Sequence, residues 1–452
     1  MILLQSGGKT YFMEKLKILT QRAFLRSPSI HVGIKAEIEG IFSDDEFNSA
    51  LELVCKKHPL LLSTISIETD SNAYYLLNSC KEIEVEFSQY TEIDQWLKWY
   101  EMKDNQPFDF ESGPLLKMCV IRDHENTTIV ILGHHLLGDG LAYIYLFRDL
   151  MKALSNELDS LELIPLILKT ESTFPSKAKA GIVTRILANY LNRAWKRNSK
   201  KFTNEDSYEF FYNYRRKYSP ALYLNSLDKE NTEKIISKCH QNKITVNEAL
   251  ITAFLYSIQK VDEKHIGKTD EVGVAINVRN ELTPHPGESM GNFVSGIMVK
   301  IKYDYSSSYW QNARTIGIKL KKKLRNPKSR FGVLNLLAAL DPELIDSIGF
   351  AKYGNYKNKV SEKLADIIGE RTVDKGIGVT NLGKFDIKLN NPRFEIKEVV
   401  FIQPAFPAND INIGVLTLNG NITFCLRYLK SEKSYELIDK IFCDAIRLLA
   451  DS

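Results

Sequence analysis

The chain has 452 residues, of which 44% are hydrophobic and 26% charged, a balance typical of a globular protein with a large core. This length exceeds one ordinary domain and predicts two or three. A net charge of only +4 argues against a nucleic-acid binder, which would carry a clustered basic face.

Cysteine usage and apolar runs indicate the compartment. The six cysteines are scattered, with no CxxC pair, so we expect neither a disulfide framework nor a zinc site, but a reducing compartment. The opening residues MILLQSGGKTYFMEKLK lack the apolar core and cleavage site of a signal peptide. The longest apolar runs are only strand-length, so we expect no transmembrane helix and a cytoplasmic protein.

The first part of the chain predicts helices and strands in alternation. Residues 44–57 place Phe47, Leu51 and Val54 at helical spacing after an acidic first turn. HPLLLSTISIE then predicts a turn into a strand. LLKMCVIR and TTIVILGHH, separated by the polar turn DHEN, predict a hairpin, and LAYIYLFRDLMKAL predicts a helix.

The loop GHHLLGDG (133–140) joins that hairpin to that helix and holds two of the eight histidines of the chain. Because side chains alternate on an extended segment, one histidine faces a cleft and the other faces packing. A neutral imidazole is a versatile general base near neutral pH. The aspartate either orients the histidine or braces the loop by pairing with a buried arginine, and the residues alone leave both open. They also leave open a purely structural pair of histidines.

Residues 156–205 change character, with prolines at 165 and 175 followed by the strongly basic stretch 176–201. We expect a crossover linker between two lobes, with its Lys and Arg side chains in water. An alternative is a docking face for an acidic carrier protein or an anionic lipid surface, because Ile182, Ile186, Leu187 and Tyr190 form an apolar stripe.

The second half restarts with a helix over 245–261, opened by a Thr245–Glu248 capping box. DEVGVAINVRN and NFVSGIMVKI predict strands. EVVFIQP and INIGVLTLNGNITFCLRYL predict a C-terminal meander with a turn at Asn419–Gly420. The basic run 319–330 predicts a solvated helix end and loop, with a phosphate-contacting role as the alternative.

Two apparent catalytic patterns are rejected. GESMG (287–291) matches the G-x-S-x-G motif of serine hydrolases, but a strand-like run follows it and every histidine precedes Ser289. Neighbouring histidines on a strand point to opposite faces, so His134 and His135 cannot easily share one ion. We expect no metal site.

His134-His135-x-x-x-Asp139-Gly140 resembles the HHxxxDG motif of the chloramphenicol acetyltransferase-like superfamily. This superfamily includes nonribosomal peptide condensation domains, polyketide-associated acyltransferases and alcohol acetyltransferases. Other segments are similar to the family in the same order along the chain: HPLL (58–61), QPFDFESGPLLKMCVI (106–121), TVNEALITAFLYSI, INVRN (276–280), MGNFVS (290–295) and VTNLGKFD (379–386).

The resemblance implies an α/β fold of the α+β sandwich type, with two similar lobes in a V and a tunnel between them. We expect an N-terminal lobe over 1–165, the basic linker over 166–205 and a C-terminal lobe over 206–452. In the family the second histidine is catalytic, which maps to His135, while His134 supports it from behind. Asp139 would be structural and would pair with Arg279.

The implied activity is acyl transfer from a thioester to an alcohol or amine, with His135 as general base. Coenzyme A or a carrier protein's phosphopantetheine arm would carry the acyl group as substrate, and no cofactor would be permanently bound. Candidates to stabilise the oxyanion are the backbone near Gly140 and the side chains of Thr380 and Asn381. The expected protein is a monomer.

Three alternatives stay open. A freestanding condensation enzyme would form an amide between carrier-bound partners, and an epimerase would use His135 to move a Cα proton. A noncatalytic recruitment module on the same fold belongs to a different class.

Overall fold

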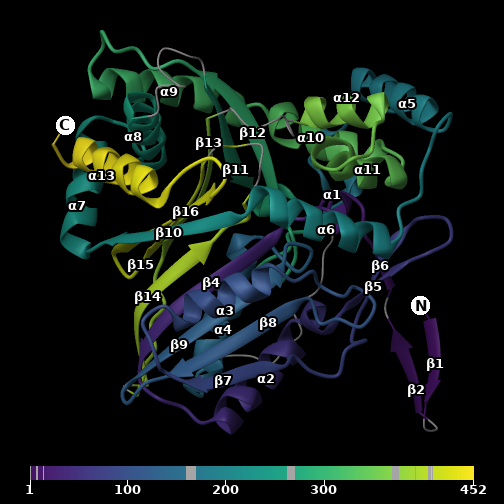
Figure 1. Cartoon of the computed structure of the whole chain (residues 1–452), viewed down its shortest axis with the longest axis horizontal. Coiled ribbons are helices and arrows are strands. Elements are labelled where there is room, and N and C mark those ends of the chain that lie inside the picture. The colour runs from purple at the N-terminus through teal and green to yellow at the C-terminus, as the bar shows by residue number, and fades with distance from the viewer. Residues whose placement is uncertain are drawn as a thin grey trace.

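The structure, a computed structural model, describes residues 2–6, 9–13, 15–158, 169–261, 270–368, 376–391, 393–405, 409 and 411–451. The chain builds two large mixed sheets, each with its own helices, and a third group made of helices (Figure 1). Two small sheets complete the described strands: β1 (Ile2–Ser6) with β2 (Lys9–Met13), and β3 (Lys15–Lys17), β6 (Ala73–Leu76) and β5 (Thr64–Ile67).

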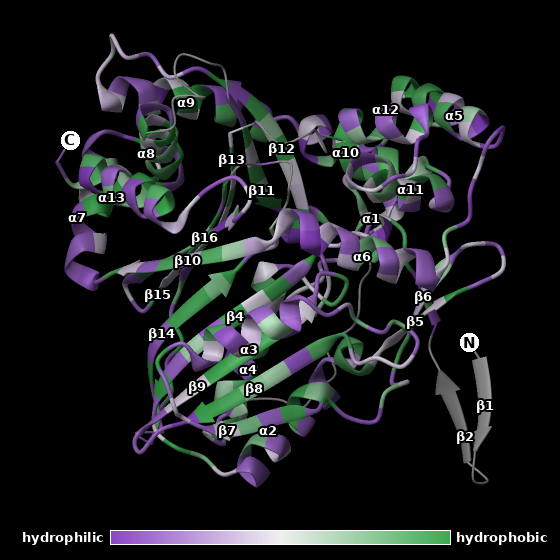
Figure 2. Ribbon diagram, viewed as in Figure 1, coloured by the Kyte–Doolittle hydropathy of each residue, from purple (hydrophilic) through white to green (hydrophobic). Residues whose placement is uncertain are grey.

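The first large sheet has five strands in the order β14 (Glu395–Ile402), β4 (His31–Glu39), β9 (Asn126–His134), β8 (Leu116–Arg122) and β7 (Val85–Gln89). Its helices are α2 (Asp44–Lys57), α3 (Gln95–Asp104) and α4 (Gly140–Leu154). The strands of this sheet are rich in apolar residues (Figure 2).

Two glycines show why both faces of this sheet are covered. A Cβ at Gly33 would lie 2.7 Å from the Tyr100 ring of α3, and one at Gly133 would lie 2.0 Å from the Tyr143 hydroxyl of α4. Gly33 pairs with Leu132, the neighbour of Gly133, so the two glycines face opposite sides of the sheet. Helices α3 and α4 therefore pack on opposite faces, at places where any larger side chain would collide.

The second large sheet has six strands in the order β10 (Pro220–Leu227), β16 (Asn421–Leu429), β15 (Ile411–Leu418), β13 (Ile377–Phe385), β11 (Asp270–Asn277) and β12 (Val294–Ile301). Its helices are α7 (Lys229–Gln241), α8 (Val246–Val261), α9 (Tyr309–Leu324) and α13 (Tyr435–Asp451). Sheet and helices share one hydrophobic core, separate from that of the first sheet.

The third group is helical and has its own core. It contains α5 (Ile182–Trp195), α6 (Asn204–Tyr218), α10 (Pro327–Ala339), α11 (Pro342–Tyr353) and α12 (Lys359–Ile368), and α1 (Arg22–Leu25) packs against α11. Short 3-10 helices lie at Pro59–Leu62, Glu171–Thr173, Ser176–Ala178 and Arg279–Glu281. Within the described residues, no helix is both long and apolar enough to cross a membrane.

The local predictions for helices are confirmed. Helix α2 spans the predicted residues and begins with a capping box between Ser43 and Glu46. The predicted box of α8 is also present: the Thr245 N–H donates to Glu248 Oε2 at 2.8 Å, and the Glu248 N–H to Thr245 Oγ1 at 3.2 Å. Such reciprocal bonds satisfy backbone donors that a helix start leaves unpaired.

The predicted C-terminal meander is wrong in one strand. β15 and β16 form the expected hairpin, with positive φ at Asn419 and Gly420. β14, however, pairs antiparallel with β4 and not with β15. Local sequence fixes the extended conformation of β14 but not its partner, which lies about 360 residues earlier. A strand from the expected C-terminal lobe thus forms an edge of the first sheet, while the lobe boundaries themselves stay a prediction.

Candidate functional site

The loop 133–140 lies where β9 ends and α4 begins, and both halves of the chain hold it. On one side the His135 N–H donates to the Ile30 carbonyl at 2.9 Å. On the other side Gly138 forms a β-bridge with Gly291, and the Asp139 N–H donates to the Gly291 carbonyl at 3.2 Å. The motif is therefore at the junction of the two sheets.

His135 lines a cavity and is 6% exposed. Its Nδ1 lies 2.7 Å from the Gly138 carbonyl oxygen. That oxygen can only accept, so a hydrogen bond to it requires the proton on Nδ1. The Asn292 amide nitrogen also lies 2.9 Å from Nδ1. The ring stacks on Phe24 at 4.6 Å between centroids. Nε2 is then the nitrogen with the free lone pair, and no described residue is recorded as its hydrogen-bond partner.

Burial lowers the pKa of His135 below its usual value, and the nearby Lys169 cation lowers it further. The hydrogen bond to Gly138 and the charge of Asp139 act in the opposite direction. The net result is an imidazole that is neutral at physiological pH, as a proton acceptor must be.

His134 points to the other side of the loop, into aromatic packing. Its ring makes edge contacts with Phe110 at 5.2 Å, Phe108 at 6.0 Å and His31 at 6.1 Å. Its Nδ1 accepts from the Leu136 N–H at 3.2 Å. Burial holds the pKa of His134 well below its usual value, so this histidine is a neutral packing residue.

Asp139 connects three elements. Oδ1 accepts from the Ala142 N–H at 3.0 Å, which caps α4, and from Arg279 Nη2 at 3.1 Å. Oδ2 accepts from the Phe293 N–H at 2.8 Å. Both partners of the ion pair are buried, so Asp139 braces the loop and does not contact the His135 ring nitrogens.

Arg279 is 2% exposed and is held by the loop that carries GESMG. Its Nη1 donates to the carbonyls of Ser289 at 3.0 Å and Gly287 at 3.3 Å. The glycines of GESMG thus shape a loop around Arg279, as the rejection of Ser289 as a nucleophile implies.

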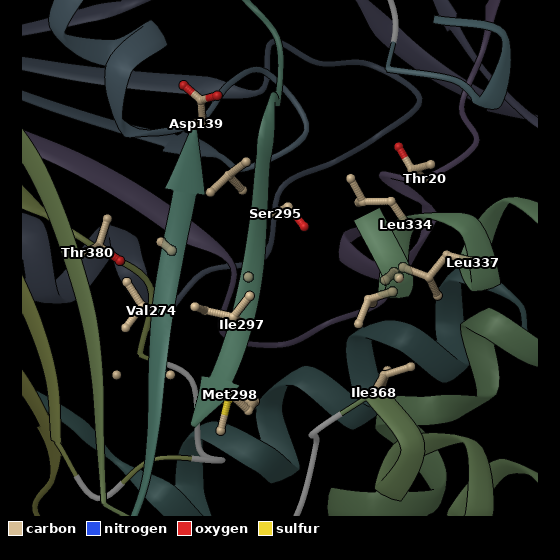
Figure 3. Close-up of a pocket in the computed structure, with 18 of the residues that line it drawn as sticks. Thr20, Asp139, Val274, Ser295, Ile297, Met298, Leu334, Leu337, Ile368 and Thr380 are labelled. Carbon is tan, nitrogen blue, oxygen red and sulfur yellow. The ribbon is translucent and has the colours of Figure 1, made fainter. Parts of the chain in front are cut away.

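The cavity beside His135 has a volume of about 690 Å³ and is lined by residues of both sheets and of the helical group. Figure 3 places Asp139 at one end of the lining and Met298 and Ile368 toward the other, with Val274 and Ile297 between them. The wall is mainly apolar. Gly140 belongs to it, and a Cβ there would lie 2.7 Å from Leu382 and 2.8 Å from Phe401.

Of the two candidates on β13 to stabilise the oxyanion, Thr380 and Asn381, only one lies at the cavity. Thr380 lines the cavity (Figure 3), whereas Asn381 is not among the lining residues. The Asn381 Oδ1 instead accepts from the Gly383 N–H at 2.9 Å. Adjacent residues on a strand face opposite sides, so only Thr380 is brought to the cavity.

Lys169 and Asn292 belong to the site, although neither is among the predicted site residues. Lys169 is 1% exposed, lines the cavity and donates through Nζ to the Val294 carbonyl and to Asn292 Oδ1 at 3.4 Å. The Asn292 amide nitrogen donates to the His135 carbonyl at 3.4 Å. Burial lowers the pKa of Lys169 to about 7. The only sequence signal was Asn292 itself, within the family-like segment MGNFVS.

Within the described part of the chain, no cluster of three or more His, Cys, Asp or Glu side chains could hold a metal ion.

Comparison with known proteins finds one similar family model and several similar sequences. Residues 18–164 match the model of the Condensation domain family. Bacitracin synthase 3 from Bacillus licheniformis is 26% identical over 188 residues, which cover 38% of this chain and 3% of the synthase. This chain spans only 3% to 6% of the length of the curated relatives it matches.

Solved structures share the fold over nearly the whole chain. Trichothecene 15-O-acetyltransferase from Fusarium sporotrichioides aligns with a TM-score of 0.66 at 10% identity, covering 99% of this chain and 96% of that one. The epimerization domain from the third module of tyrocidine synthetase B aligns with a TM-score of 0.62 at 14% identity, covering 97% and 96%. The expected fold class is thereby confirmed. Residues 18–164 thus match the Condensation domain family, and the whole chain shares the fold of these structures, which agrees with the resemblance in its sequence.

Proposed function

We propose that this protein transfers an acyl group from a thioester to a hydroxyl or amine, with His135 as the general base. The observation that carries the proposal is the orientation of one ring: Nδ1 of His135 is tied to the Gly138 carbonyl, and the ring lines the cavity at the junction of the two sheets. With the proton on Nδ1, the Nε2 lone pair is left for an incoming proton.

The reaction needs no covalent intermediate on the protein. As the acceptor oxygen or nitrogen attacks the thioester carbonyl, Nε2 takes its proton. The tetrahedral intermediate then collapses, the C–S bond breaks, and the imidazolium gives the proton to the leaving thiolate. A cavity that holds both reactants makes this encounter effectively unimolecular.

The developing oxyanion needs donors near His135. We propose the backbone N–H groups near Gly140 and the Thr380 hydroxyl, because both residues line the cavity. Lys169 is a further cation close to His135. It would favour the anionic intermediate while it is protonated.

We propose that the donor is an acyl group on coenzyme A or on a carrier protein's phosphopantetheine, bound as substrate and not as a resident cofactor. The condensation-domain match supports a carrier-bound thioester, and the structural likeness to an acetyltransferase is compatible with a free one. The acceptor would be a small alcohol or amine. All six cysteines are free, which fits a reducing cytoplasm, and we expect a monomer.

An epimerase is the second candidate, because the epimerization domain noted above shares the fold over 97% of this chain. In that reaction His135 would move the Cα proton of a carrier-bound aminoacyl group. An amide-forming condensation between two carrier-bound partners uses the same base as acyl transfer and differs only in its acceptor.

Intact mass spectrometry of acceptor pools incubated with mixed acyl thioesters tests the proposal. We expect an acceptor to gain the mass of one acyl group with the native protein and not with His135→Ala. Washout of tritium from an aminoacyl carrier, without a new acyl product, would instead establish the epimerase. If a broad panel gives neither result while partner binding persists, the noncatalytic recruitment module is correct.

A further inference from the structure

Helix α5 has an apolar face that the described residues leave exposed. Its buried side packs into the helical group through Ala188, Leu191 and Trp195. Four other side chains are exposed: Ile182 (79%), Val183 (80%), Ile186 (63%) and Tyr190 (57%). At about 100° per residue, these four occupy one arc of about 100° on the helix. We call them the α5 stripe.

A contiguous stripe of this kind differs from scattered exposure. Single exposed apolar residues are normal on any protein surface, and this chain has them at Ile93 and Ile318. Several large apolar side chains side by side on one helix instead mark a surface that another body covers.

The stretch of chain that carries the stripe is basic, and its Arg185 lies 3.9 Å from Glu171. Residues 172–204 contain no Asp or Glu, and they contain eight basic residues: Lys177, Lys179, Arg185, Arg193, Lys196, Arg197, Lys200 and Lys201. A helix with an apolar face between basic flanks has the pattern of helices that lie in the interface of an anionic bilayer.

The stripe also borders the cavity described above. Thr184 and Leu187, on the same helix, line that cavity, and so does Ile367 of α12, which is itself 40% exposed. The cavity thus reaches the surface beside the stripe, at the end away from Asp139. Figure 1 shows α5 and α12 at an outer corner of the molecule, where a flat surface can approach the helix.

We propose that the α5 stripe and its basic flanks dock the protein on an anionic lipid surface, with one end of the cavity facing the membrane. The apolar residues would enter the boundary of the acyl chains while the Lys and Arg side chains contact lipid headgroups. An apolar substrate dissolved in the membrane could then reach the cavity without crossing water. This docking does not depend on which reaction His135 performs.

Co-sedimentation of the full chain with vesicles tests the docking. We expect binding to vesicles with 30% phosphatidylserine in phosphatidylcholine, little binding to phosphatidylcholine alone, and weaker binding at high salt. The double variant Val183→Asn, Ile186→Asn should bind at least about tenfold more weakly. Both positions are exposed, so the fold should be kept, and circular dichroism checks this.

Two further variants separate the contributions. Ile318→Asn removes an exposed isoleucine (69%) from α9 and should bind like the native chain. Lys196→Gln with Arg197→Gln should weaken binding only to the phosphatidylserine vesicles.

The docking is overturned if the native chain binds both vesicle types equally weakly, or if the stripe variant binds like the native chain. Two other results would assign the stripe to a protein: loss of activity only with carrier-bound thioesters, without vesicle binding, or a native dimer that the stripe variant dissociates.

Discussion

The two sides of the motif loop give adjacent, identical residues different properties. His134 faces three aromatic rings and accepts a backbone N–H, whereas His135 faces the cavity and donates to a backbone carbonyl. Burial lowers the pKa of both. Burial alone therefore does not make a base. Nδ1 is hydrogen-bonded in both rings. The difference lies in whether that nitrogen accepts, as in His134, or donates, as in His135, and in which ring lines the cavity.

Removal of the His135 ring, which lines the cavity, should have the largest effect on activity. His135→Ala should lower kcat by about 10²–10⁴-fold, the usual contribution of a positioned general base. The free energy of unfolding should change little, because the side chain borders a cavity. Product formation at a fixed amount of folded protein measures the first effect, and denaturant unfolding the second. A variant within tenfold of the native kcat would remove His135 from the mechanism.

Loss of the Asp139–Arg279 pair should have the next largest effect, and that effect should be on stability. Asp139→Ala leaves Arg279 buried without its carboxylate and removes the cap of α4, so it should cost about 3–5 kcal/mol of unfolding free energy. Urea denaturation measures this loss. Adding Arg279→Met should restore part of the stability, and a double variant no more stable than Asp139→Ala would mean that the pair does not act as a unit.

Removal of the His134 ring should lower stability and leave kcat nearly unchanged, the reverse of what is expected for His135. His134→Ala leaves the Leu136 N–H unpaired and should cost about 1–3 kcal/mol of stability, while kcat per folded molecule stays within tenfold. The low pKa of folded His134 means that the unfolded chain binds an extra proton below about pH 6.5. Native stability should therefore fall as the pH drops, and the variant should show a shallower slope. An unchanged slope would contradict the packing role.

Lys169 should shift the pKa of His135 without being essential for the reaction. Its charge helps to lower the pKa of His135, so Lys169→Met should raise that pKa and move the acid limb of kcat/KM to higher pH. Lys169→Arg keeps the charge and should leave the limb in place. Identical limbs in native and Lys169→Met proteins would show that the cation does not act on His135.

The smallest expected effect on kcat is at β13, where the neighbours Thr380 and Asn381 should differ. Thr380→Val should lower kcat by about tenfold or less, and Asn381→Ala should leave kcat unchanged because its side chain bonds to Gly383. Parallel assays of both variants check the alternation. A larger loss from Asn381→Ala would reverse the assignment.

Local signals in the sequence predicted local structure well. The acidic start and apolar spacing of 44–57 gave α2, and the Thr245–Glu248 box gave the start of α8. The alternation along the strand predicted that His134 and His135 would face different ways. The pairing of Asp139 with Arg279 came from the family resemblance, because 140 residues separate the two.

What the sequence did not provide depends on long-range contacts. Nothing in EVVFIQP specifies that β14 adds to β4. Lys169 became part of the site only because folding buries it beside Asn292. Asn381 was a candidate because the resemblance covered the whole segment, but only the strand register decides which of two neighbours faces the cavity.

Chemical rescue of His135→Ala by added imidazole tests the central claim most directly. If Nε2 is the proton acceptor, product formation by the variant should rise with the concentration of neutral imidazole, and more steeply at higher pH. His134→Ala should not respond. A His135→Ala variant with the native rate, or a rate that follows imidazolium and not imidazole, would contradict the account.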